Sequence, residues 1–218
     1  MEDLQRLGAV FAVPTMTFWS WSFFFLYVDL KKRPRWLAQR KIQADVTSWV
    51  KFREAASDLL RQQRYFLLFA VCAIARLRSC VRAGPLPPLA DIGKFVVTAY
   101  AFHAVCFYYL HRLLHVPILY KWIHHIHHRW QAPTAIATIS AHPLENIFVN
   151  AGPLVLVTAF CKPHIASLAV VLALATTQAA WEHSGYRLLD NGHHDAHHQF
   201  RNCNYGHRLL DRMHGTAK

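Results

Sequence analysis

The sequence predicts an all-α, polytopic membrane protein with about four or five apolar helices and a helical cap of histidine motifs. Three observations predict this fold class. Hydrophobic residues make up 54% of the 218 residues and only 17% are charged, which is unusual for a soluble protein. Several uncharged stretches approach the length of a membrane-spanning helix. All 16 histidines lie at or beyond His103, where short histidine-rich motifs follow the apolar stretches.

The positive charges are placed as expected beside a membrane. The formal net charge is +12, and more than half of the 24 lysines and arginines lie between Lys31 and Arg82, next to apolar segments. Nucleic-acid-binding proteins gather their bases on one face or along one helix, whereas the cytosolic flanks of membrane helices are enriched in lysine and arginine. The charge pattern therefore favours a bilayer-embedded protein and no nucleic-acid partner.

The first apolar element is expected to be a membrane anchor, residues 1–30. Residues 8–28 contain no charge, which is long enough for a spanning helix, and they lack a basic start and a small-residue cleavage site. The run KKRPR at 31–35 predicts that this end faces the cytosol. Residues 31–91 are expected to form a basic interfacial segment, in which residues 65–81 either form a short span or never cross.

The remaining apolar stretches belong to the predicted catalytic domain, residues 92–218. Residues 95–110 predict one helix, interrupted only by His103. Residues 147–161 and 165–181 flank the sequence CKPH and predict a helical hairpin whose arms are short for a full crossing. A hairpin returns the chain to the side that it left, so the histidines before and after it share one face. That face is cytosolic if residues 65–81 span the membrane, which we expect, although Arg76, Arg78 and Arg82 would then lie near the far side against the positive-inside rule.

Three short motifs carry imidazoles at helical spacing. HRLLH has histidines at positions i and i+4, and HHIHH and HHDAHH both contain the frame HxxHH, so each motif presents its histidines on one side of a helix. These histidines are His111, His115, His124, His127, His128, His194, His197 and His198. A zinc site takes four ligands and a mononuclear iron oxygenase three, so eight imidazoles fit a dinuclear metal site better. Imidazole suits iron, zinc, copper and nickel alike.

Nearby carboxylates are suited to the layer that surrounds the metal ligands. Glu145 in HPLEN, Glu182 in WEHSGY and Asp195 inside HHDAHH would accept hydrogen bonds from ligand N–H groups and fix their tautomers. His125 and His193 are the spare members of their motifs. A histidine surface that responds to pH is the alternative interpretation, but the repeated HxxHH frame favours a metal site.

The motifs resemble those of the fatty acid hydroxylase and sterol desaturase superfamily, the membrane-bound non-haem di-iron oxygenases. The resemblance runs from about residue 100 to residue 216 and rests on YYLHRLLH, KWIHHIHHRWQAP, AHPLEN, EHSGY, HHDAHH and LLDRMHGT, in the family's order. These motifs are most similar to the 4-methylsterol monooxygenase branch. The resemblance implies that the eight motif histidines bind metal, adds His183 of EHSGY as a ligand, and places His142 of AHPLEN in the surrounding layer.

The resemblance also implies a function. It implies two iron ions, dioxygen as co-substrate, electrons from NAD(P)H through a reductase or a b-type cytochrome, and residence in the endoplasmic reticulum membrane. The implied enzyme is a monooxygenase of lipid biosynthesis that hydroxylates or oxidises a C–H bond of a sterol or fatty-acyl lipid, with sterol methyl oxidation favoured. No catalytic side chain beyond the metal site is expected.

Two features depart from the methylsterol branch and leave the lipid substrate open. The loop at 187–192 is short and lacks proline, and AFHAVCF precedes the first motif where acidic residues are usual. Neither departure removes a motif histidine. An acyl-lipid desaturase of the same superfamily and a non-catalytic membrane protein that binds or transports zinc are the alternative functions, and an oxygenase that has lost its substrate loop is a third.

Overall fold

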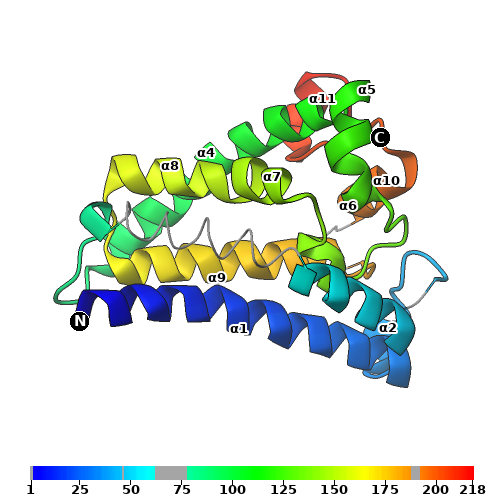
Figure 1. Ribbon diagram of the computed structural model, residues 1–218, viewed down its shortest axis with the longest axis horizontal. Helices are drawn as coiled ribbons and strands as arrows, with labels where there is room; N and C mark the ends of the chain where they lie inside the picture. The colour runs from blue at the N-terminus through cyan, green and yellow to red at the C-terminus, as the bar shows by residue number, and fades with distance from the viewer. Residues whose placement is uncertain (1, 46, 62–77, 188–191) are drawn as a thin grey trace.

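The computed structural model describes residues 2–45, 47–61, 78–187 and 192–218, which contain helices, turns and only isolated β-bridges (Figure 1). The helices of the first half are α1 (Glu2–Lys31), α2 (Arg35–Ala38), a helix at 49–61, η1 (Arg78–Cys80) and α4 (Leu89–Leu114). They are followed by α5 (Pro117–Leu119), the π-turn η2 (Tyr120–His124), α6 (His125–His128) and η3 (Ala135–Ile139). The last elements are α7 (Pro143–Glu145), the π-turn η4 (Asn146–Ala151), α8 (Gly152–Cys161), α9 (Ile165–Glu182), α10 (Gly192–Phe200) and α11 (Arg208–Met213). The predicted all-α class is confirmed.

Among the described residues, four helical segments are long and apolar enough to cross a membrane. They are Phe11–Lys31, Leu89–Leu114, Pro143–Cys161 and Ile165–Glu182. Their outward-facing apolar side chains are open to the surroundings, with Val97 69%, Phe148 62% and Phe160 79% exposed. An apolar exterior of this kind suits lipid tails. The expected polytopic architecture is therefore confirmed for four helices, whereas the fifth candidate, at 65–81, falls mostly on residues outside those that the structure describes.

The predicted hairpin is formed by α8 and α9. Lys162 ends α8 in the left-handed conformation (φ 46°), and the Nδ1 atom of His164 caps α9 by accepting a hydrogen bond from the Ala166 backbone N–H at 3.1 Å. The core between α4 and the two arms consists of Phe95, Ala99, Val157, Leu168 and Val171. On the other side, α1 lies along α9, where the Trp21 indole N–H donates to Thr177 Oγ1 at 3.1 Å (Figure 1).

The histidine motifs are brought together at one end of this helical layer. Helices α1, α4 and α9 run toward that end, α8 runs away from it, and α5, α6, α10 and α11 cover it (Figure 1). The predicted helical cap is therefore present, and the motifs before and after the hairpin share one face. The chain after α1 reaches the same end, because the Ile42 backbone N–H donates to the Gly185 carbonyl at 2.9 Å and the Arg187 N–H donates to the Arg40 carbonyl at 2.8 Å.

A buried ion pair fixes this junction between α1 and the segment after α9. Asp29 is 3% exposed, and its Oδ1 atom lies 3.0 Å from Lys41 Nζ and accepts the Tyr186 hydroxyl. Lys41 Nζ also donates to the Ser184 carbonyl at 3.2 Å. Gly185 adopts φ +72°, and a Cβ atom at this position would lie 3.2 Å from Lys41 Nζ. The approach of the lysine therefore requires glycine both for its backbone conformation and for its lack of a side chain.

We predict that Asp29→Ala destabilises the protein by about 3 to 5 kcal/mol, because it leaves the buried Lys41 ammonium without its counter-ion. Asp45→Ala is the matched control, since Asp45 pairs with Lys51 where their side chains are 56% and 37% exposed. The control should lose less than about 1 kcal/mol. Thermal and denaturant unfolding of the purified protein in detergent measures both; equal losses for the two variants would contradict a stabilising role for the buried pair.

Candidate metal centre

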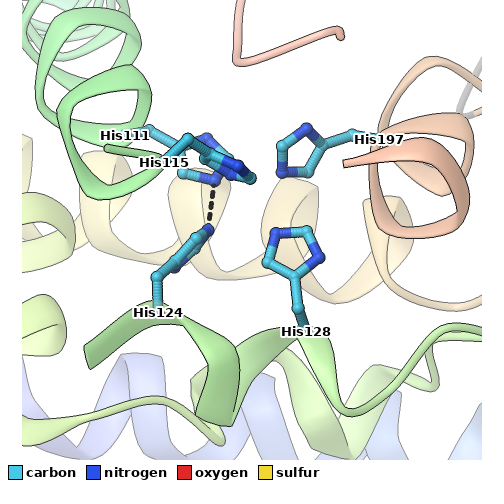
Figure 2. Close-up of side chains that lie close together, drawn as sticks. All are labelled: His111, His115, His124, His128 and His197. Carbon is cyan, nitrogen blue, oxygen red and sulfur yellow. Dashed lines mark hydrogen bonds between the residues drawn. The ribbon is translucent and has the colours of Figure 1, made fainter. Parts of the chain in front are cut away.

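Nine histidines converge in two adjacent clusters, and they are the nine that the sequence and the resemblance single out. The first cluster consists of His111, His115, His124, His128 and His197. The second consists of His127, His183, His194 and His198. Within each cluster the nearest ring nitrogens all lie within 4.8 Å of one another, and all nine side chains are buried except the half-buried His115. Figure 2 shows the five rings of the first cluster pointing toward a common centre from α4, the segment 124–128 and α10.

Each HxxHH motif divides its histidines between the two clusters. His124 and His128, four residues apart, enter the first cluster, while His127 between them enters the second. The C-terminal motif does the reverse, since His194 and His198 enter the second cluster and His197 enters the first. On a helix the residues at i+3 and i+4 flank the residue at i on opposite sides and lie about 100° apart, so the two can face different neighbours. One motif can therefore bridge two neighbouring metal ions.

Helix ends supply most of these side chains. His111 lies in the last turn of α4 and His115 caps its C-terminus, while His183 caps the C-terminus of α9. His124 ends the π-turn η2, which runs directly into α6. The histidines thus lie just beyond the apolar segments, at the level where those helices would leave a membrane.

The protein partners of the rings define their tautomers. His111 Nδ1–H donates to the Tyr205 carbonyl at 2.6 Å, and His183 Nδ1–H donates to the Ala179 carbonyl at 2.8 Å. His124 Nδ1 lies 2.9 Å from the Glu145 carboxylate. Because carbonyl oxygens only accept, the protons of the neutral His111 and His183 rings are on Nδ1, and an ionised Glu145 places the His124 proton on Nδ1 as well. The Nε2 atom of each ring is then a bare lone pair, which is the form that binds metal.

These unprotonated nitrogens face one another, and the distances between them show whether a metal ion fits the site. His111 Nε2 lies 2.9 Å from His124 Nε2, and with Glu145 ionised neither nitrogen carries a proton to donate. The buried Nε2 atoms of His115 and His197 and both ring nitrogens of His128 have no hydrogen-bond partner. Two lone pairs at this distance repel, and unpaired buried polar atoms are destabilising. A cation between the rings removes both problems, so the donor set fits a metal ion.

Burial also makes it unfavourable for these rings to bind protons in place of a metal cation. Burial, followed by repulsion from neighbouring His111, lowers the pKa of His115 to about 3. Burial and His115 lower the pKa of His197 to about 3, and burial lowers the pKa of His183 to about 4. The imidazoles therefore stay neutral at physiological pH and available as ligands.

The three carboxylates expected around the ligands differ in their contacts. Glu145 is buried and contacts His124, as described above. Glu182 instead accepts a hydrogen bond from Gln178 Nε2 at 2.8 Å, and Asp195 accepts one from Gln43 Nε2 at 3.1 Å. Neither of these two carboxylates bonds to a histidine of either cluster within the part of the chain that the structure describes. A second-layer role for them stays a prediction.

The other histidines of the motifs lie outside both clusters. His125 is exposed, and His193 Nε2 lies 3.0 Å from Asp211 Oδ2. His142 accepts a hydrogen bond from the Leu144 backbone N–H at 3.2 Å and so caps α7. Its expected place around the ligands stays a prediction. The short loop at 187–192 lies mostly on residues that the structure does not describe.

Several contacts of the site have no signal in the sequence. The carbonyls of Ala179, Cys203 and Tyr205 accept the Nδ1–H groups of three candidate ligand histidines. The ring of Tyr120 lies against those of His115 and His128, with centroids 5.6 and 5.7 Å away. A backbone carbonyl is present at every residue, so only the three-dimensional structure shows which ones are used.

Comparisons with known proteins agree with the motifs. The profile of the fatty acid hydroxylase family matches residues 96–216. The chain is 30% identical over 220 residues to human "fatty acid hydroxylase domain-containing protein 2", covering 96% of this chain and 66% of that protein. It is 39% identical over 116 residues to "fatty acid hydroxylase ahd1" of Mycosarcoma maydis, covering 51% of this chain and 30% of the relative.

A further relative carries a sterol name. "Methylsterol monooxygenase 1" of Rattus norvegicus is 34% identical over 122 residues, covering 50% of this chain and 41% of the relative. The chain thus spans at most 66% of the length of these three relatives. No solved structure matches the chain significantly.

We predict that the metal-free protein loses stability as the pH falls below 6.5. The unfolded histidines take up protons below their ordinary pKa of 6.5, whereas His115, His183 and His197 resist protonation until about pH 3 to 4 when folded. Protons therefore favour the unfolded state, by up to about 2 kcal/mol per such histidine at pH 5. Thermal unfolding of the metal-free protein at pH 7.5 and pH 5 tests this, and an unchanged midpoint would contradict it.

We predict that Glu145→Gln weakens metal binding by about 10- to 100-fold, because an amide accepts the His124 N–H more weakly than a carboxylate does. Glu182→Gln is the matched control, since it changes a nearby carboxylate that bonds to Gln178. Zinc affinity of the purified variants, measured by competition with a chelator, distinguishes them. Equal weakening in both variants would show that contact with His124 is not the reason.

Proposed function

Because the chain belongs to the fatty acid hydroxylase family, we propose that it is a membrane-bound oxidoreductase that uses dioxygen to oxidise a C–H bond of a lipid. The observation that carries this proposal is the pair of buried histidine clusters at the ends of four apolar helices. Nine metal-binding histidines in a soluble protein would be compatible with many functions. Because these histidines lie where the apolar helices end, they are positioned for a reaction on a molecule dissolved in the bilayer.

The proposed cofactor is a pair of iron ions, one for each cluster. The first ion would be held by His111, His115, His124, His128 and His197, and the second by His127, His183, His194 and His198. The chemistry that such a pair supplies when bound is activation of dioxygen with electrons from outside, which an unactivated C–H bond requires. The close approach of His128 and His198, whose ring centroids are 4.9 Å apart, places the two ligand sets side by side.

The chain's own residues have four tasks in this proposal. The carbonyls of Ala179, Cys203 and Tyr205 and the Glu145 carboxylate hold protons on Nδ1, which leaves Nε2 free for metal. The direction of each of these hydrogen bonds fixes the orientation of the histidine ring that makes it. The burial of the clusters excludes bulk water, and the buried negative charge of Glu145 offsets part of the metal charge.

We propose that the substrate is a sterol or a fatty-acyl lipid that enters sideways from the bilayer. The exposed apolar faces of the four helices support a lipid environment, and the relatives' names refer both to fatty acid hydroxylases and to methylsterol monooxygenases. Sterol methyl oxidation in lipid biosynthesis is the activity we favour, because the motifs are most similar to that branch. Hydroxylation and desaturation both begin by removing hydrogen, so product analysis distinguishes this activity from that of a desaturase.

We further propose that the histidine end faces the cytosol in the endoplasmic reticulum membrane. The basic run at 31–35 follows α1 at the same end as the clusters, and Arg40 and Ile42 pair with the segment after α9. Arg82 lies at the opposite end, where its Nε–H donates to the Lys162 carbonyl, so the assignment rests on the larger run. Electrons from NAD(P)H would then arrive on the cytosolic side through a reductase or a b-type cytochrome.

We propose a separate role for each of three parts of the chain. In this proposal residues 1–30 anchor the protein in the membrane, residues 31–91 form a basic interfacial segment with the candidate short span at 65–81, and residues 92–218 form the catalytic domain. The family match at 96–216 lies within the last of these.

The proposal is tested by lipid oxidation in the purified full chain. Iron-loaded protein in lipid nanodiscs, supplied with NADPH and a reductase, should oxidise C-4-methylated sterols or acyl lipids in a dioxygen-dependent reaction detected by mass spectrometry. His127→Ala removes a ligand of the second cluster, and it should lower this activity by more than about 100-fold, since losing outer partners alone costs about 10- to 100-fold. His125→Ala, which changes an exposed histidine of the same motif, should keep it.

Two outcomes would overturn the proposal. Cells that express the wild type and the His127→Ala variant would show identical lipid profiles if the chain were not an oxygenase. Tightly bound zinc, with no lipid oxidation after exchange for iron and addition of reductant, would instead support the zinc-binding alternative.

A further inference from the structure

A short segment after α10 contacts candidate ligands from two different helices. We call this segment, Cys203–Tyr205, the carbonyl strap. His197 Nδ1–H, from α10, donates to the Cys203 carbonyl at 2.6 Å, and His111 Nδ1–H, from α4, donates to the Tyr205 carbonyl at 2.6 Å. Both histidines belong to the first cluster, where Figure 2 shows their rings directed toward the common centre. The strap therefore sets the tautomer of two of five candidate ligands.

The middle residue of the strap is held in an unusual conformation. Asn204 has no exposed surface and adopts φ +56°, in the left-handed region that asparagine tolerates better than most residues. Its side chain donates to the His193 carbonyl at 3.0 Å and accepts the Lys218 backbone N–H at 2.8 Å. Its backbone N–H donates to the Thr216 carbonyl at 2.8 Å. Asn204 thus joins the strap to α10 and to the C-terminal residues.

A second buried side chain holds the end of the strap. Asp211 of α11 has no exposed surface. Its Oδ1 atom accepts the Tyr205 backbone N–H at 2.8 Å and the Thr216 hydroxyl at 2.7 Å. Its Oδ2 atom accepts the Gly206 backbone N–H at 3.1 Å and lies 3.0 Å from His193 Nε2. Each carboxylate oxygen accepts a hydrogen bond from a backbone N–H. An NH2 group in place of either oxygen would therefore set one donor against another.

We propose that Asp211 and Asn204 are positioning residues for the metal centre, and that they act on His111 and His197 through the carbonyl strap. The proposal rests on the metal binding in the proposed function and extends it to residues that contact no ligand nitrogen. A strap that shifts would release the Nδ1 protons and allow the other tautomer, in which Nε2 carries hydrogen and cannot bind metal. In the second cluster, His183 is oriented instead by its own helix through Ala179.

The proposal therefore expects a loss confined to one of two metal sites. Metal-free full-length protein is titrated with Co²⁺, whose absorption bands report the ligand geometry, and the bound ions are counted. The wild type should bind two ions per chain. Asp211→Asn should bind one ion with wild-type affinity and the other about 10- to 100-fold more weakly. Asn204→Gly, which tolerates the positive φ but removes the side chain, should show the same pattern more mildly.

His207→Ala is the matched control for general loosening of α11. The His207 ring caps this helix by accepting the Leu209 backbone N–H at 3.3 Å, and its removal leaves every hydrogen bond of Asp211 in place. The control should keep both cobalt sites at wild-type affinity. In the metal-free protein, ¹⁵N chemical shifts of the histidine rings should show protonated Nδ1 at His111 and His197 in the wild type and in the control, and a mixture of tautomers in the other two variants.

The outcomes separate this proposal from the proposed function. Two unaltered cobalt sites in both Asp211→Asn and Asn204→Gly overturn the positioning role alone. An equal loss at both sites, with the same loss in His207→Ala, shows that α11 has only a structural role and also overturns it. A wild type that binds no ion at either cluster overturns the metal centre itself.

Discussion

The close approach of unprotonated imidazole nitrogens inside a buried site is the constraint on which the rest of this structure depends. His111 Nε2 and His124 Nε2 lie 2.9 Å apart, and with Glu145 ionised both rings carry their protons on Nδ1, on the far side. Such an arrangement is unfavourable by itself, because lone pairs repel and buried polar atoms need partners. It is stable when a metal cation supplies the missing charge, and otherwise the surrounding protein must hold the rings in place.

Several elements of the protein hold the histidine rings in place through hydrogen bonds, and some of these elements lie outside the matched family region. The carbonyl strap, the end of α9 and Glu145 hold the Nδ1–H groups. Before residue 96, Asp29 and Lys41 fix the segment that follows His183. Gln43 Nε2 donates both to the Gln131 carbonyl at 2.9 Å and to Asp195 Oδ2 at 3.1 Å, and so connects two histidine motifs. The arrangement of the two histidine clusters is consequently a property of the whole chain rather than of its C-terminal half.

The four apolar helices explain why such a site lies where it does. Apolar side chains are exposed along these helices, while the polar cap begins where the helices end. Charged and polar groups are costly within a bilayer but not at its surface. A metal centre at the helix ends can therefore be polar and still lie beside the lipid. Both requirements of the proposed reaction, an activated oxidant and an apolar substrate, meet at this level.

The sequence by itself predicted the elements whose signals are local. Uncharged length predicted the anchor at 1–30, because a membrane span needs about 20 apolar residues. Two shorter apolar stretches, 147–161 and 165–181, predicted the arms of the hairpin. Helical spacing predicted the eight motif histidines, and the family resemblance added His183. Glu145, Glu182 and Asp195 were all expected around the ligands because they lie near the motifs in the sequence, and of these Glu145 contacts a cluster histidine while the other two bond to glutamines.

Only the tertiary structure decided how these elements meet. The division of each HxxHH motif between two clusters depends on which helices face its two sides, and spacing alone does not specify the facing helix. The roles of Asp29, Asn204 and Asp211 depend on contacts between residues up to about 160 positions apart, as in the hydrogen bond from Tyr186 to Asp29. Backbone carbonyls such as that of Tyr205 are chemically alike along the chain, so packing alone selects the ones that orient the metal ligands.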